Sequence, residues 1–356
     1  MSTRSQSEHI ENRQASHQPS TPRSVQPLPR DTALDFTKGS LVLFMVLYHW
    51  LNYFLGRQGQ YYNYLRFLTP SFIFITGFMI SQVHLRRYGT GGPRLPKRLA
   101  VRGLKLLAVF VGLNTLVGAV LAGSLAWRSL PARLLSAFIG GDLIASGGPK
   151  SIAFNILVPI AYLLISSAAL IILTRLVKYA FHYALSLSIL VIIFLNSYGM
   201  DSPYLELLMV GLLGVVMGFA RSDQIALVVS HPYLLSVLYC LYLAVITFSD
   251  VTLPLQTAGV ILTIALLYIA GTAGAESGAA WHYTILLGQY SLLGYISQIA
   301  ILQGLRRISW LYQYGVLALI SSLLLGVLLT VMAVGIVDLA RRKSKVADGL
   351  YQFVFG

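Results

Sequence analysis

The stretch that decides the fold is RDTALDFTKGSLVLFMVLYHW, residues 30–50, in which a basic residue opens an apolar helix and a histidine follows eleven residues later. Eleven steps at ~100° and ~1.5 Å per residue place Lys38 and His49 on one face, about 16 Å apart. That distance is about half of a hydrocarbon core. A cation at the membrane edge could hold the charged end of a ligand while the imidazole meets its far end. The plainer alternative makes Lys38 a cytoplasmic flank and His49 a solvated tip, but a histidine inside an apolar span is costly, which favours function.

The composition indicates a polytopic membrane protein. Hydrophobic residues make up 56% of the 356 residues and charged residues 11%, with a mean hydropathy of +0.72. Soluble domains usually carry about 25% charged residues. We expect one transmembrane domain at residues 31–340, after a disordered cytoplasmic tail at 1–30 and before a cytoplasmic tail at 341–356. Cys240 is the only cysteine, which excludes an intrachain disulfide.

The predicted fold class is all-α, with about ten transmembrane helices. Apolar runs long enough to cross a bilayer lie roughly at 39–55, 65–83, 103–123, 151–173, 179–196, 204–220, 229–248, 255–273, 283–303 and 314–338. With an N-terminus inside the cell, most Lys and Arg residues fall on the cytoplasmic side. This asymmetry predicts that both termini are cytoplasmic in a plasma or inner membrane. The same asymmetry explains the net charge of +14 as a mark of cytoplasmic loops, so we expect no nucleic-acid partner.

Two sequence motifs carry a family resemblance. Leu34-Asp35-x-x-Lys38-Gly39, with ten residues between Lys38 and His49, resembles the Leu-Asp-x-x-Arg-Gly opening and the Arg-x10-His motif of the membrane acyltransferase 3 superfamily. Residues 97–106 and 70–78 resemble most its heparan-α-glucosaminide N-acetyltransferase-like branch. The resemblance implies a catalytic set of Asp35, Lys38 and His49, with His49 as general base. Lys38 replaces the family's arginine, so the charge is kept and the planar fork is lost.

A basic stripe is predicted at the mouth of the third helix. Arg98, Arg102 and Lys105 recur at i, i+4 and i+7, and topology puts them on the same membrane face as Lys38. Guanidinium groups suit the 3′-phosphate and pyrophosphate of coenzyme A. We therefore expect these four residues to bind acetyl-CoA, the acyl donor implied by the resemblance. The alternative is that the charge is only a topology signal that also attracts anionic lipid.

Three polar residues are predicted to bind the acceptor. Asn155 either lines a cavity or makes an interhelical hydrogen bond. Glu206 either orients an acceptor or caps its helix. Gln298 lies in a segment, residues 288–298, that resembles the family's late Gly-x-x-Ser-Leu-x-x-Tyr motif, at a position where many members carry a histidine. The sequence has no zinc-ligand spacing, so we expect no metal.

These features predict an integral membrane acyltransferase that moves an acyl group, most simply acetyl, from acyl-CoA to a hydroxyl or amine of a saccharide or cell-envelope glycan. Expected partners are that glycan and membrane lipid, and a homo-oligomer stays open. The rival class is a carrier or flippase for a lipid-linked or small anionic substrate, because ten helices with buried His and Glu also describe a transporter. No inverted repeat is visible, which counts against a carrier. A structural or sensory membrane protein is the third alternative.

Overall fold

The computed structural model describes residues 30–56, 61–88, 94–121, 134–138, 154–220, 222–274, 278–308 and 315–355. Regular structure in these ranges is helical, and they contain no strand. Internal contacts separate Met1–Arg30 from a second unit, Asp31–Gly356. The tail predicted for residues 1–30 lies outside the described residues except for Arg30, and the account below concerns the second unit.

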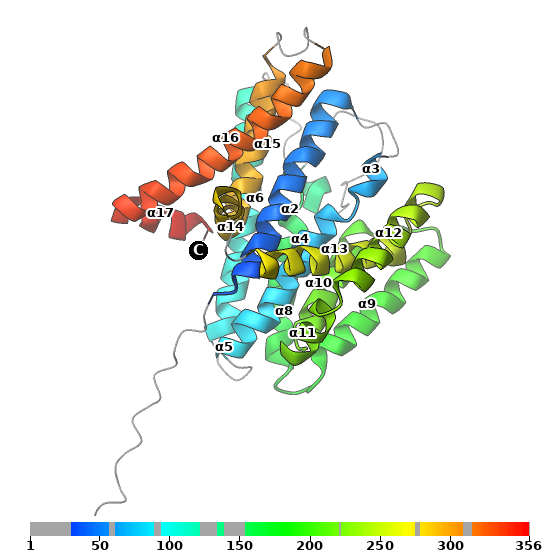
Figure 1. Cartoon of the computed structure of the whole chain (residues 1–356). Helices are drawn as coiled ribbons and strands as arrows, with labels where there is room; N and C mark the ends of the chain where they lie inside the picture. Colours follow the sequence, from blue (N-terminus) through cyan, green and yellow to red (C-terminus); the bar gives the residue numbers. More distant parts are fainter. Residues whose placement is uncertain are drawn as a thin grey trace, which may run out of the picture. The chain divides into compact units, whose positions relative to one another are not determined.

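Figure 1 shows the arrangement of the helices in the described ranges. In chain order they are α2 (Thr32–Trp50), the π-helix η1 (Leu51–Leu55), α3 (Tyr61–Tyr64), α4 (Leu68–Met79), the π-helix η2 (Ile80–Leu85), α5 (Arg86–Tyr88), α6 (Arg94–Leu121), α8 (Leu157–Leu173), α9 (Ala180–Ser197), α10 (Pro203–Met217), α11 (Ser222–Val229), α12 (Pro232–Phe248), α13 (Leu253–Ala273), α14 (Ala279–Gln289), α15 (Ser291–Arg306), α16 (Gly315–Lys343) and α17 (Lys345–Phe355).

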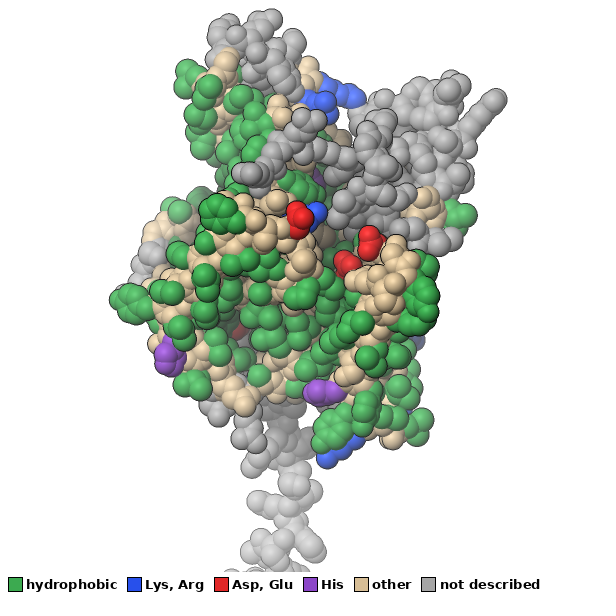
Figure 2. Space-filling model, turned by 90° about the vertical axis from the view of Figure 1, so that its right-hand side faces the viewer, with side chains coloured by type: hydrophobic (Ala, Val, Ile, Leu, Met, Phe, Trp, Pro, Cys, Tyr) green, Lys and Arg blue, Asp and Glu red, His purple; other side chains and the backbone are tan. Residues whose placement is uncertain are grey.

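The structure confirms the class of an all-helical membrane protein. Within the described residues, five helices are long and apolar enough to cross a membrane, or six if α14 and α15 form one broken span. The helices α8, α10 and α12 are apolar but shorter. Figure 2 shows a face covered mainly by hydrophobic side chains, as expected of a surface in contact with lipid. Each of the ten predicted segments contains helix, and the number of crossings stays a prediction.

The ninth predicted span is not one straight helix, which corrects the sequence interpretation. The segment is broken at Tyr290 into α14 and α15, whose axes differ by 98°. The Tyr290 hydroxyl donates to Asp338 Oδ1 on α16 at 2.8 Å, and the Arg341 guanidinium donates to the same hydroxyl at 3.1 Å. These contacts with a later helix lie at the bend, where Gly288-Gln289-Tyr290-Ser291 interrupts the apolar run.

The first long helix, α2, contacts α4, α13, α14, α15 and α16. Its apolar side chains Leu41, Val42 and Val46 are fully buried. Near its end the Trp50 indole donates to Ser322 Oγ of α16 at 2.7 Å. Burial of this helix among its neighbours fixes the direction of Lys38 and His49, which define the candidate site.

Candidate functional site

The helix α2 carries Lys38 and His49 without interruption, as predicted. Asp31 caps its N-terminus, because its side chain accepts the Leu34 amide at 3.0 Å. The helix then runs to Trp50, so the eleven helical steps from Lys38 to His49 span about 16 Å. A π-helix, η1, follows directly after Trp50, the residue next to His49. Such π segments are rare and occur often at functional sites.

Lys38 and Asp35 form an ion pair at one end of this helix. Lys38 Nζ lies 2.7 Å from Asp35 Oδ1, and the two side chains are 12% and 5% exposed. The structure therefore brings together two of the three predicted catalytic residues. It also neutralises the Lys38 charge within the chain, so Lys38 is less available to an outside phosphate than an exposed cation would be.

Two glycines let α14 pack directly on the motif around Lys38. A Cβ at Gly39 would lie 1.8 Å from the Thr284 carbonyl oxygen, and a Cβ at Gly288 would lie 1.7 Å from the Asp35 carbonyl oxygen. Both obstacles are backbone atoms that cannot rotate away. Gly39 is thus required by the contact between α2 and α14, and its partner Gly288 belongs to the late motif recognised in the sequence.

The other end of α2 holds His49 in an aromatic cluster. The ring centroids of His49 and Tyr53 lie 5.9 Å apart, and those of His49 and Tyr295 lie 6.2 Å apart. The Phe154 ring packs edge-on against Tyr295, also at 6.2 Å. His49 Nε2 is buried. The cluster joins α2, η1, α15 and the chain that enters α8, which are far apart in the sequence.

Gln298 lies one turn beyond Tyr295 on the buried face of α15. Its side chain is 0% exposed, and neither its amide nitrogen nor its amide oxygen has a hydrogen-bond partner among the described residues. Residues three apart on a helix share a face, so Gln298 lies on the same side of α15 as Tyr295. Buried amide groups are nearly always hydrogen-bonded, so this amide calls for a partner, such as a water molecule or a ligand.

Asn155 lies at the edge of the same cluster. Its Oδ1 is buried and has no hydrogen-bond partner in the described part of the chain. The preceding residue, Phe154, has a φ of 62°, the one positive φ among the described non-glycine residues. This left-handed conformation costs about 1–3 kcal/mol and is found preferentially at functional sites. The structure therefore brings Asn155, His49 and Gln298 to one region.

Glu206, the third predicted acceptor residue, is not joined to this cluster. It lies in the first turn of α10, and Asp201 is its electrostatic neighbour. The alternative given above, a carboxylate near a helix N-terminus, describes its position better.

The basic stripe on α6 contacts aromatic and backbone groups. Arg98 donates to the Tyr88 hydroxyl at 2.6 Å and lies over that ring. Arg102 is an electrostatic neighbour of Tyr351 on α17. Lys105 Nζ donates to the Gln352 carbonyl at 3.5 Å, near the C-terminal end of α17, where a cation offsets the helix dipole. Part of the stripe thus holds α17.

The helix α17 was not predicted from the sequence, which assigned residues 341–356 to a tail. Arg341 donates to Asp348 Oδ1 at 2.8 Å and lies over the Tyr351 ring at 4.0 Å. Burial raises the pKa of Tyr351, and the positive charges of Arg341 and Arg102 act in the opposite direction. The signal for this helix was present in the sequence: its exposed apolar residues, Val346, Leu350 and Phe353, recur at helical spacing.

Comparison of the chain with protein-family models, with curated proteins and with solved structures finds no match. Within the described residues, no group of three His, Cys, Asp or Glu side chains could hold a metal ion. The chemistry of the site is therefore argued from its own residues.

Proposed function

We propose that this chain is an integral membrane acyltransferase that moves an acyl group, most simply acetyl, from acyl-CoA to a hydroxyl or amine of a saccharide or cell-envelope glycan. The observation that supports the proposal best is the cluster around Tyr295. It places His49, from the early motif, against Tyr295 of the late motif, three residues before Gln298, although the two motifs are about 250 residues apart. Two segments selected for one resemblance are therefore in contact.

In the proposed reaction His49 acts as a general base. Its neutral imidazole takes the proton of the acceptor hydroxyl or amine, and the acceptor heteroatom attacks the thioester carbonyl. The carbon–sulfur bond breaks, the CoA thiolate leaves, and the proton passes from the imidazolium to that sulfur. The buried amides of Gln298 and Asn155 supply donors and acceptors for the glycan hydroxyls, which would satisfy groups that have no partner among the described residues.

The donor phosphates are assigned to Arg98 and Arg102. Both side chains are exposed, and their partners named above are neutral tyrosines, so their positive charges are not neutralised by those contacts. Lys38, by contrast, is paired with a carboxylate. We infer that Lys38 and Asp35 mainly hold α2 in place at the donor end and that Lys105 holds α17. The proposal places this face on the cytoplasmic side of a cell membrane, with both termini inside.

The test is release of free CoA by the purified full-length protein in nanodiscs, supplied with acetyl-CoA and a panel of acceptor sugars. The wild type should release CoA faster when an acceptor is present. His49→Ala should lower turnover by roughly 100- to 10,000-fold, the usual contribution of a general base. His282→Ala is the matched control, because His282 is exposed on α14. It should retain wild-type turnover.

Two results would contradict the proposal. One is equal CoA release by the wild type and His49→Ala. The other is uptake of a labelled anionic or lipid-linked substrate into sealed vesicles with no CoA released, which is the behaviour of a carrier.

A further inference from the structure

The last helix, α17, has one face fixed against the protein. At the bend between α14 and α15, the ring centroids of Tyr290 and Tyr351 lie 5.3 Å apart. Lys105 of α6 donates to the Gln352 carbonyl at 3.5 Å, and its amine lies 5.8 Å from the centre of the Phe353 ring. Together with the contacts to α16 described above, these contacts fix how α17 is rotated about its own axis.

The rest of α17 carries two exposed strips of opposite character. The apolar strip consists of Val346, Leu350 and Phe353, whose side chains are 81%, 65% and 74% exposed. These three residues recur at i, i+4 and i+7, so they share one face of the helix. The polar strip consists of Lys345 and Gln352, which are also exposed, and Gln352 lies two helical steps, or about 200°, from Leu350. A helix that exposes an apolar and a polar strip is typical of the boundary between lipid and water.

The N-terminal end of α17 lies at the border of a candidate membrane span. The preceding helix, α16, is apolar enough to cross a membrane, and its exposed apolar side continues to Leu339, which is 52% exposed. Four basic residues follow at positions 341–345. Basic residues at the end of a span mark the headgroup level on the cytoplasmic side. The helix α17 begins within this basic segment and does not continue the axis of α16 (Figure 1).

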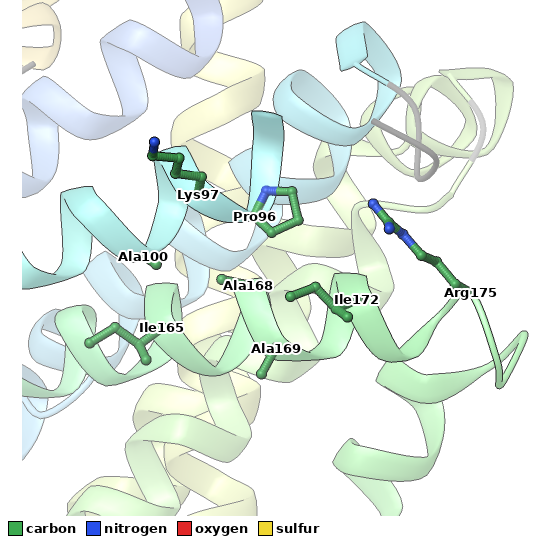
Figure 3. A pocket seen from close by; sticks show the side chains of 8 residues that line it. All are labelled: Pro96, Lys97, Ala100, Ile165, Ala168, Ala169, Ile172 and Arg175. Carbon is green, nitrogen blue, oxygen red and sulfur yellow. The ribbon is translucent and has the colours of Figure 1, made fainter. Parts of the chain in front are cut away.

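The C-terminal end of α17 is bound to the border of a second candidate span, α6. Lys105, which contacts Gln352, is the last basic residue of α6 before its apolar run. The helix α17 therefore connects two spans at the level where each changes from basic to apolar. The groove between α6 and α8, where Ala100 and Ala168 lie, is on another side of α6 (Figure 3). Ala100 is five helical steps, or about 140°, from Lys105, so α17 and α8 pack on different faces of α6.

We propose that α17 is an interfacial helix whose apolar strip lies in the lipid bilayer, at the headgroup level of the leaflet predicted to be cytoplasmic. The polar strip then faces water. The bilayer is the occupant because the strip lies at the same border as the exposed apolar side of α16, and because both ends of α17 are held at the basic edge of a span. Apolar helix faces at this level are buried about 5–10 Å into the boundary between headgroups and acyl chains. The inference does not depend on the proposed reaction.

The first test measures the depth of nitroxide labels by electron paramagnetic resonance. The full-length protein carries Cys240→Ser, which removes its only cysteine, and is labelled at Leu350→Cys in nanodiscs. A label on the apolar strip should lie about 5–10 Å inside the headgroup boundary. It should therefore collide more with oxygen, which concentrates in lipid, than with a water-soluble nickel complex. The matched control is Gln352→Cys on the polar strip, where the order should be reversed.

Two results of this experiment would overturn the proposal. If the label at position 350 collides more with the nickel complex than with oxygen, the apolar strip faces water and is open to a soluble partner. If labels at position 350 broaden each other's spectra, a second copy of the chain covers the strip in place of lipid.

The second test measures amide hydrogen exchange of residues 345–355 in nanodiscs. Val346→Ser combined with Leu350→Ser and Phe353→Ser removes the contacts with lipid and leaves the inner face of α17 intact. Exchange should become at least about tenfold faster, because these side chains no longer hold the helix in the bilayer. The control Lys345→Ser, on the polar strip, should leave the rate unchanged. An unchanged rate in the triple variant would show that lipid does not hold the strip, and the proposal would fail.

Discussion

Replacement of Gln298 by leucine should make the protein more stable and less able to bind its acceptor. The two polar atoms of this side chain are fully buried, without a partner among the described residues. Burying an unbonded polar group costs about 1–3 kcal/mol, so two such atoms cost at least about 2 kcal/mol. Leucine has similar volume and removes that cost. At about 2.1 cal/mol/K of unfolding entropy per residue, 1 kcal/mol moves the melting temperature of a 356-residue chain by about 1.3 °C, so Gln298→Leu should melt about 3 °C higher.

The same substitution should impair acceptor binding. Loss of one or two neutral hydrogen bonds weakens binding by about 0.5–1.5 kcal/mol each, which should raise the acceptor KM by roughly 3- to 100-fold. The KM for acetyl-CoA should not change, because the predicted donor contacts lie on α6. Melting is measured by tryptophan fluorescence and KM by CoA release.

Gln303→Leu is the matched control on the same helix. Its amide donates to the Tyr53 hydroxyl at 3.4 Å, so leucine there removes a bond and relieves no orphaned group. This control should not raise the melting temperature. If Gln298→Leu destabilises the protein instead, the amide has a structural partner and the reasoning about an acceptor site fails.

Three further changes test the rest of the site. Gly39→Ala should prevent stable folding, because its Cβ would lie 1.8 Å from a backbone carbonyl oxygen. The control Gly335→Ala, whose Cβ would have no atom within 4 Å, should be neutral or stabilise the protein by up to about 1 kcal/mol. Thermal melting distinguishes the two variants. Lys38→Met should destabilise by about 3–5 kcal/mol because the Asp35 carboxylate stays buried, and adding Asp35→Leu should recover most of that loss in the same assay. Arg102→Gln should raise the KM for acetyl-CoA and flatten its dependence on salt; identical curves at 50 and 300 mM salt, about a twofold difference in Debye length, would remove Arg102 from the donor site.

The parts that the sequence predicted well are those set by local pattern. The first helix was predicted from its apolar run, although its start at Thr32 was not, and the relation of Lys38 to His49 follows from helical geometry. The Lys38–Asp35 ion pair was not predicted, although a spacing of three residues allows it. The number of membrane crossings stays a prediction, since apolar length alone does not fix how each helix is oriented.

The parts that it missed are set by contacts between distant segments. The bend at Tyr290 depends on Asp338 and Arg341, about 50 residues later, and neither is visible in the apolar pattern of that segment. The helix α17 is held by Arg341 and by Lys105, although the helical spacing of its apolar residues was present in the sequence. The orphaned amide of Gln298 was equally hidden, since the sequence gives its residue type and not its surroundings.

The contrast between the two ends of α2 indicates where a ligand binds. At the Lys38 end two basic residues are paired with carboxylates: Lys38 with Asp35, and Arg341 with Asp348. At the His49 end, Gln298 and Asn155 keep buried polar atoms without partners among the described residues, and Phe154 holds a strained backbone conformation. Selection for stability alone would replace these side chains, because a protein with leucine at position 298 should have a larger free energy of unfolding. These unbonded polar groups are explained if a bound acceptor supplies the missing hydrogen bonds. We therefore assign the proposed chemistry to the His49 end of α2.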